Sequence, residues 1–185
     1  MGGTMSDKEV EYVVTFLEMT RRPTAPPPPL PAGPKIALMA AKRPPPDYFL
    51  YLYGTVGADY EWTDWFAAPR PVLEAFVHDP KIELFTMMLD GWPGGFFIVD
   101  TRVAGVCDLS YFGLVREAIG RGLGTWLVAT AVRTGWDRPG VERLTVNTCT
   151  LDHPRALVLY QKAGFVAVHR ETRRRALTGR RPRRG

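Results

Sequence analysis

Gly120-Arg121-Gly122-Leu123-Gly124 is the stretch of sequence that says most about this chain. A run of strand-like composition, residues 109–115, precedes these alternating glycines, and a helix-like run follows them. A loop of this kind directs backbone N–H groups and the dipole of the following helix at an anion. Because glycine has no β-carbon, a phosphate oxygen can approach the main chain closely. The loop therefore predicts a phosphate-bearing ligand.

Two well-known phosphate-binding patterns do not fit this loop. A nucleotide P-loop ends in Gly-Lys-Ser/Thr, whereas Leu123-Gly124-Thr125 supplies no lysine. A dinucleotide-binding fingerprint needs a third glycine three residues after the second, where this chain has Thr125. On these residues alone, a plain glycine-rich turn between a strand and a helix stays an equal alternative.

A second motif lies about 30 residues downstream, in the segment 152–165, which reads DHPRALVLYQKAGF. Together with the glycine loop it resembles the GNAT superfamily of N-acetyltransferases, which use acetyl-CoA. In that family the loop runs Gln/Arg-x-x-Gly-x-Gly/Ala and the later helix runs Asn-x-x-Ala-x-x-Leu-Tyr-x-Lys-x-Gly-Phe. This chain departs from the pattern at Ile119, in place of Gln/Arg, and at His153, in place of Asn. The resemblance extends over roughly residues 80–170.

The resemblance implies an α/β (α+β) fold with a mixed, mostly antiparallel central sheet, helices on both of its faces and a splayed pair of strands that binds CoA. It implies that backbone groups of Phe112 and Leu114 pair with the pantetheine arm and polarise the acetyl carbonyl, an oxyanion-hole role. Ile119 lacks the side chain that the family uses at the loop, so we expect weakened rather than abolished binding. The cofactor-binding residues it implies are Phe112, Leu114, Ile119, Gly120, Arg121, Gly122, Leu123, Gly124, Thr125 and His153.

Acetyl transfer needs an unprotonated amine, a stabilised oxyanion and a proton for the leaving thiolate, but no nucleophilic residue. By resemblance, Tyr160 lies near the sulfur, and a phenol with a pKa of about 10 is a suitable proton donor at neutral pH. Asp108 stands where several family members carry a catalytic glutamate, and period-two alternation puts it on the same strand face as Leu114. Tyr160 and Asp108 are therefore the predicted catalytic residues. His153 either assists them or caps the following helix, and Glu117 is expected to face solvent.

Length and composition predict one globular domain over residues 1–170, because 185 residues with 45% hydrophobic content can bury a sizeable core. A proline-rich segment, residues 23–34, is expected to lie extended on the surface. The Asp90-Gly91 pair indicates a hairpin. The pattern predicts strands at 11–18, 82–89, 95–100, 103–115, 144–150 and 165–169, and helices at 49–56, 71–78, from 123 to 135 and from 154 to 163.

Aromatic residues are concentrated between Tyr48 and Trp65. In the family, the helices after the first strand line the acceptor side of the cleft. These rings therefore either shape an acceptor pocket or pack in the core, and the sequence favours neither.

Charge and cysteine usage restrict the partners. From Arg170 onward there are eight arginines and one glutamate, more positive charge than the net +5 of the whole chain, so the remainder is slightly acidic. Residues 171–185 are expected to form a disordered tail with weak affinity for nucleic acid. Two cysteines predict neither a disulfide framework nor a metal site, and reduced thiols favour the cytoplasm. No stretch reaches the apolar length of a membrane span.

These observations favour an enzyme that moves acetyl from acetyl-CoA to a primary amine of a small molecule or a protein. A homodimer is compatible with them. Two alternatives remain open, namely a non-catalytic acyl-CoA sensor of the same fold and a nucleic-acid binder that works through its arginine-rich tail.

Overall fold

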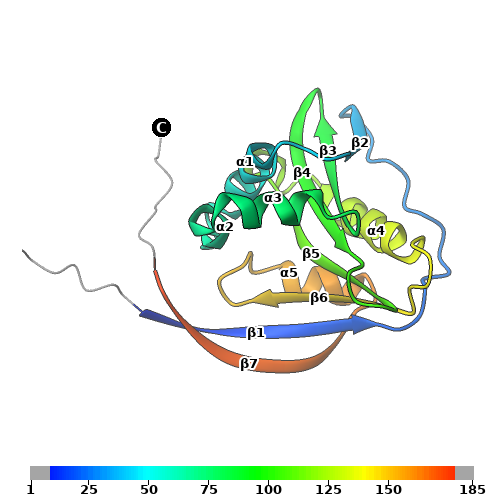
Figure 1. The fold of residues 1–185 in the computed structure, drawn as a ribbon. Coiled ribbons are helices and arrows are strands. Elements are labelled where there is room, and N and C mark those ends of the chain that lie inside the picture. Colours follow the sequence, from blue (N-terminus) through cyan, green and yellow to red (C-terminus); the bar gives the residue numbers. More distant parts are fainter. Residues whose placement is uncertain (1–8, 178–185) are drawn as a thin grey trace, which may run out of the picture.

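A computed structural model describes residues 9–177, which form a seven-stranded mixed sheet in the order β2-β3-β4-β5-β6-β1-β7 (Figure 1). All neighbouring strands are antiparallel except β5 and β6, which are parallel. The elements are β1 (Glu9–Met19), β2 (Ile36–Ala41), α1 (Pro46–Gly57), α2 (Asp64–Ala67), α3 (Arg70–His78), β3 (Ile82–Leu89), β4 (Trp92–Asp100), β5 (Val106–Leu114), the 3-10 turn η1 (Arg116–Ala118), α4 (Leu123–Trp136), β6 (Arg143–Cys149), α5 (Ala156–Lys162) and β7 (Val166–Ala176).

Helices cover both faces of the sheet, as neighbouring residues of β5 demonstrate. A β-carbon on Gly113 would meet Val56 of α1, whereas the side chain of Leu114 reaches Gly124 of α4. Because successive residues of a strand point to opposite faces, α1 and α4 lie on opposite sides of β5. The predicted mixed sheet with helices on both faces is confirmed.

Local sequence explains the positions of several elements. Proline occupies the first turn of α1 and of α3, where its missing N–H costs nothing. Asp90 and Gly91 both have positive φ, 50° and 93°, so the predicted hairpin joins β3 to β4. The run 96–99 is fully buried, as expected for a central strand that is covered on both faces.

Three predictions about the strands need correction. The short edge strand β2 was not predicted, because six residues after a proline-rich segment carry little pattern. The last strand continues to Ala176 rather than ending at 169. Residues 171–176 are therefore not a disordered tail, since Glu171–Arg175 pair with β1 through Val10–Val14. The remaining part of the predicted tail, 178–185, lies outside the described residues.

Strands β5 and β6 diverge, and this divergence positions the site. Only residues 106–108 of β5 pair with residues 143–145 of β6, although both strands continue well beyond that point. The predicted splayed pair of strands is therefore present. Beyond residue 108, one edge of β5 has no neighbouring strand, and this edge faces the gap.

Candidate active site

A cavity of about 440 Å³ lies in the gap between β5 and β6. One end is the glycine loop with the first turn of α4, and the walls come from β5, from the segment before α5 and from the segment after α1. Its lining residues are Val56, Tyr60, Trp62, Leu109, Ser110, Tyr111, Phe112, Gly113, Leu114, Ile119, Gly120, Gly122, Leu123, Gly124, Thr125, Asn147, Asp152, His153, Arg155, Ala156, Leu159 and Tyr160. Ten of the twelve predicted site residues therefore meet at one cavity, and only Arg121 and Asp108 do not line it.

The glycine loop leaves the N-terminus of α4 accessible from the cavity. Gly120 and Gly122 have φ of 82° and 75°, which side-chain-bearing residues rarely adopt, and a β-carbon at either would meet nothing. Helix α4 begins without a side-chain cap and without an acidic residue in its first turn. Its first N–H groups therefore have no partner from a capping side chain, and N–H groups of this kind, together with the helix dipole, are suited to bind an anion. Arg121 is exposed beside it.

The backbone of β5 presents polar groups to the gap. The N–H of Val115 donates to the carbonyl of Gly94 on the β4 side. Because backbone groups alternate in direction along a strand, those of Phe112 and Leu114 point the other way, into the gap. The two predicted oxyanion-hole residues are therefore oriented as the prediction requires.

Tyr160 of α5 is 5% exposed, and its ring packs edge-on against Phe112 and Phe165. Among residues 9–177, no side chain or backbone group hydrogen-bonds its hydroxyl, and Tyr160 lines the cavity. Burial raises the pKa of Tyr160 far above its ordinary value, helped by the negative charges of Asp152 and Asp108. The phenol therefore stays protonated and able to donate.

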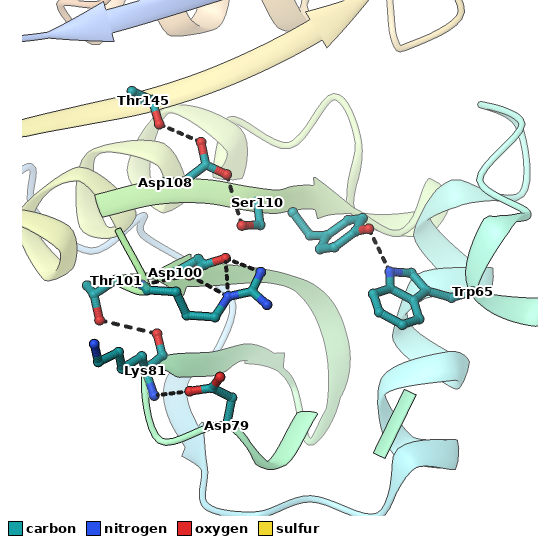
Figure 2. Close-up of polar contacts among 10 residues, drawn as sticks. Trp65, Asp79, Lys81, Asp100, Thr101, Asp108, Ser110 and Thr145 are labelled. Atoms are coloured by element: carbon teal, nitrogen blue, oxygen red, sulfur yellow. Dashed lines mark hydrogen bonds and ion pairs between the residues drawn. The ribbon is translucent and has the colours of Figure 1, made fainter. Parts of the chain in front are cut away.

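Asp108 lies where β5 and β6 separate, held between two hydroxyl groups (Figure 2). Thr145 donates to its Oδ1 at 2.6 Å and Ser110 donates to its Oδ2 at 2.9 Å. Burial raises the pKa of Asp108 despite these two hydrogen bonds. The carboxylate does not line the cavity, but Ser110 does.

The prediction that Asp108 lies on the same strand face as Leu114 is wrong, because β5 contains a bulge. Leu109 pairs with Val99 and Tyr111 with Ile98, which leaves Ser110 as an extra residue. One extra residue inverts the alternation, so Asp108 shares its face with Tyr111 rather than with Leu114. That face carries α1 to α3, since the hydroxyl of Tyr111 accepts a 2.6 Å hydrogen bond from Nε1 of Trp65 (Figure 2).

A second carboxylate, that of Asp152, lines the cavity directly. Its Oδ2 accepts 2.8 Å hydrogen bonds from the hydroxyl of Thr148 and from the N–H of Cys149. Its Oδ1 accepts a longer bond, 3.4 Å, from Nε1 of Trp62. No sequence motif marks Asp152 as a residue of the cavity. The contact that brings it into the site spans ninety residues and leaves no local pattern.

His153 accepts two hydrogen bonds within the turn that precedes α5. Its Nδ1 accepts from the N–H of Arg155 at 3.1 Å, and its carbonyl accepts from Ala156. The side chain of His153 does not cap α5 as expected, because the N-cap residue of that helix is Arg155 and it has no side-chain cap hydrogen bond. The ring of His153 does line the cavity. Glu117 is exposed, as expected.

The aromatic residues of the segment 48–65 divide between the core and the cavity wall. Phe49 and Tyr53 are buried in the core, whereas Tyr60 and Trp62 line the cavity. Their neighbour in space is Tyr111, whose ring contacts Tyr53 and Trp62 in addition to Phe49.

No cluster of three or more potential metal ligands occurs within residues 9–177. Within the same residues, no helix is long and apolar enough to span a bilayer.

A cavity between two diverging strands, which ends at the uncapped N-terminus of a helix, is the arrangement that the resemblance predicts for the N-acetyltransferase class. The family model described as "Acetyltransferase (GNAT) family" matches residues 45–165, so the chain belongs to the GNAT acetyltransferase family. Among curated proteins, none shows significant sequence similarity to this chain.

Solved structures share the fold at low sequence identity. A GCN5-related N-acetyltransferase from Kribbella flavida matches with a TM-score of 0.58 and 17% identity, over 89% of this chain and 58% of that one. An aminoglycoside acetyltransferase from an uncultured soil metagenomic sample, in complex with sisomicin, matches with a TM-score of 0.57 and 16% identity, over 72% and 90% of the two chains. The aminoglycoside N-acetyltransferase AAC(6')-Iy in complex with CoA matches with a TM-score of 0.53 and 17% identity, over 76% of this chain and 93% of that one. The chain spans about three fifths of the Kribbella protein.

Proposed function

We propose that this protein transfers an acetyl group from acetyl-CoA to a primary amine within a ternary complex. The observation that carries this proposal is one continuous cavity, which joins the uncapped N-terminus of α4 to the buried hydroxyl of Tyr160 along the free edge of β5. An anion site, an oxyanion site and a proton donor in one cavity are what acyl transfer from a CoA thioester requires.

The residues of the loop fit the pyrophosphate of CoA. Gly120 and Gly122 line the cavity with positive φ, and the absence of a β-carbon at both leaves room for phosphate oxygens to approach the main chain. Exposed Arg121 adds a positive charge, and Ile119 at the loop entrance contributes only apolar contact. The remaining contacts come from Leu123, Gly124 and Thr125 in the first turn of α4, and from His153 across the cavity.

The chemical step uses five residues of this chain. The amine nitrogen bonds to the acetyl carbon while the N–H of Leu114, with Phe112 beside it, stabilises the developing oxyanion. Ser110 takes the amine proton and passes its own proton to Oδ2 of Asp108, which it already contacts. The C–S bond then breaks, and Tyr160 donates its proton to the departing thiolate. Release of the Asp108 proton to solvent and uptake of one proton by the Tyr160 phenolate return both groups to their starting states. The products are an acetylated amine and CoA.

A sensor that binds acyl-CoA without turnover is the second candidate, because Ile119 replaces the usual loop residue and no glutamate stands at the position of Asp108. Nucleic-acid binding through the arginines has less support. Arg174 pairs with Glu11, and Arg175 hydrogen-bonds Thr63 and Asp64, so part of the positive charge is already neutralised. Free thiols at Cys107 and Cys149 support a cytoplasmic location.

Release of free thiol from acetyl-CoA, measured over a panel of primary amines, tests the proposal. We expect amine-dependent release in the parent protein and a rate at least about 100-fold lower in Tyr160→Phe. Binding of acetyl-CoA without thiol release from any amine would instead establish the sensor. No binding at millimolar acetyl-CoA would refute both candidates.

A further inference from the structure

The carboxylate of Asp152 is a charged group at the cavity wall that the transfer step does not use. Three donors from two separate parts of the chain fix its position, namely Thr148 and Cys149 on β6 and Trp62 in the segment that follows α1. A carboxylate has about four acceptor sites. Oδ2 already accepts two short bonds, whereas Oδ1 accepts only the 3.4 Å bond from Trp62, so Oδ1 retains capacity for a further donor on the cavity side.

Asp152 also has no positively charged partner. Among residues 9–177, no lysine, arginine or histidine nitrogen lies within 4.0 Å of it. Asp59 and Asp64 differ in this respect, since Asp59 pairs with Arg116 and Asp64 with Arg175. An acid that is partly buried and hydrogen-bonded but unpaired in charge is suited to bind a cation from outside.

Aromatic rings stand beside this carboxylate. The indole of Trp62 donates to it, and Tyr60 lines the same cavity with its ring edge-on to His153. Tyr60 and Asp152 both line the cavity, and burial, with the negative charges of Asp59 and Asp152, raises the pKa of Tyr60. Ring faces next to a carboxylate attract an alkylammonium group by cation–π interaction in addition to charge.

An ammonium held by Asp152 is a poor nucleophile, because an adjacent negative charge favours the protonated form of an amine. The bound cation must therefore differ from the nitrogen that is acetylated. We propose that Asp152, with Tyr60 and Trp62, binds a second ammonium group of the acceptor, so that the preferred acceptor is a diamine or polyamine. This inference rests on the proposed acetyl transfer and names the substrate class of the same cavity.

The test compares amines that match in length but differ by one charge. For the full chain with acetyl-CoA at neutral pH, kcat/KM is measured for putrescine against butylamine and for cadaverine against pentylamine. We expect the diamines to be preferred about tenfold or more in the parent, as a charge-assisted hydrogen bond provides. Asp152→Asn keeps the acceptor for Thr148 and Cys149 but removes the charge, and should bring the ratio close to one. Glu142→Gln removes the same charge from an exposed position away from the cavity and should leave the ratio unchanged.

Calorimetric titration with putrescine gives a reading that does not depend on turnover. Binding that weakens about tenfold in Asp152→Asn, but not in Glu142→Gln, supports the ammonium site even if no thiol is released, a result that would refute the transfer reaction alone. Tyr60→Leu removes one ring face at a partly exposed position and should also reduce the diamine preference. Equal ratios in the parent and Asp152→Asn, or no binding of putrescine to the parent, overturn the inference.

Discussion

Substitution of Gly122 by glutamate should abolish the rise in melting temperature that acetyl-CoA produces, whereas the same substitution at Gly140 should preserve it. The two glycines are a matched pair. Their φ angles are 75° and 72°, and a β-carbon at either would meet nothing. Gly122 lies at the N-terminus of α4 in the cavity wall, whereas Gly140 follows the opposite end of this 14-residue helix. At 1.5 Å per residue the two positions are on the order of 20 Å apart.

The expected magnitudes separate backbone strain from lost binding. A residue with a side chain in the left-handed region costs about 1–2 kcal/mol, so both variants should melt roughly 2–8 °C below the parent without ligand. A carboxylate at the N-terminus of a helix returns about 0.3–1 kcal/mol, so Gly122→Glu should melt slightly above Gly140→Glu. Ligand at 100 times its Kd stabilises by about 2.7 kcal/mol, or roughly 5–11 °C in a domain of this size.

The assay is differential scanning fluorimetry of the parent, Gly122→Glu and Gly140→Glu with increasing acetyl-CoA. In Gly122→Glu the new carboxylate lies where we place the pyrophosphate, so repulsion and lost N–H contacts should remove the ligand-dependent shift. An undiminished shift in Gly122→Glu would refute the assignment of the anion site to the start of α4. Equal loss of the shift in both variants would show that strain, rather than the site, is responsible.

Three further predictions concern other parts of the site. Tyr160→Phe should lower kcat by at least about 100-fold in steady-state assays. The unfolding free energy should change by less than about 1 kcal/mol, because the hydroxyl of Tyr160 has no partner among the described residues. A large loss of stability with unchanged kcat would contradict this. Burial raises the pKa of Asp108, so its protonated form stabilises the fold below the ordinary carboxyl pKa of about 4, and this contribution is lost as pH rises through the raised value. Urea unfolding should therefore show the parent losing stability relative to Asp108→Asn as the pH rises above about 4; a parallel pH dependence would refute the buried assignment. Arg175→Ala should lower the unfolding free energy by only about 0.5–1 kcal/mol, because its partner Asp64 is exposed; a loss of several kcal/mol in urea unfolding would argue against this weak surface pair.

Sequence reasoning correctly predicted the features of local structure that adjacent residues determine. The glycine loop, the Asp90-Gly91 hairpin and the helix that carries Tyr160 each have a local signal, since positive φ, turn type and helical period depend on adjacent residues. The mixed sheet and its splayed strand pair followed from the family resemblance, and the structure contains both.

The failures arose where the deciding contact is distant in sequence or changes the register. The bulge at Ser110 leaves no mark on the alternation of residues 106–114, yet it moves Asp108 to the other face of β5. The segment 171–176 has the composition of a solvated tail, but pairing with β1 and the contact between Arg175 and Asp64 order it. The approach of Trp62 to Asp152 depends on how α1 packs against the sheet, which no local pattern encodes.

The place of β1 between β6 and β7 has a consequence for biosynthesis. Both partners of this first strand belong to residues 143–176, so β1 leaves the ribosome long before either exists. At about 5–20 residues per second, the delay amounts to roughly ten seconds, during which Val14, Leu17 and Met19 have no sheet to cover them. Any chain released before residue 143 leaves this apolar strand permanently unpaired, and such fragments should depend on chaperones or aggregate.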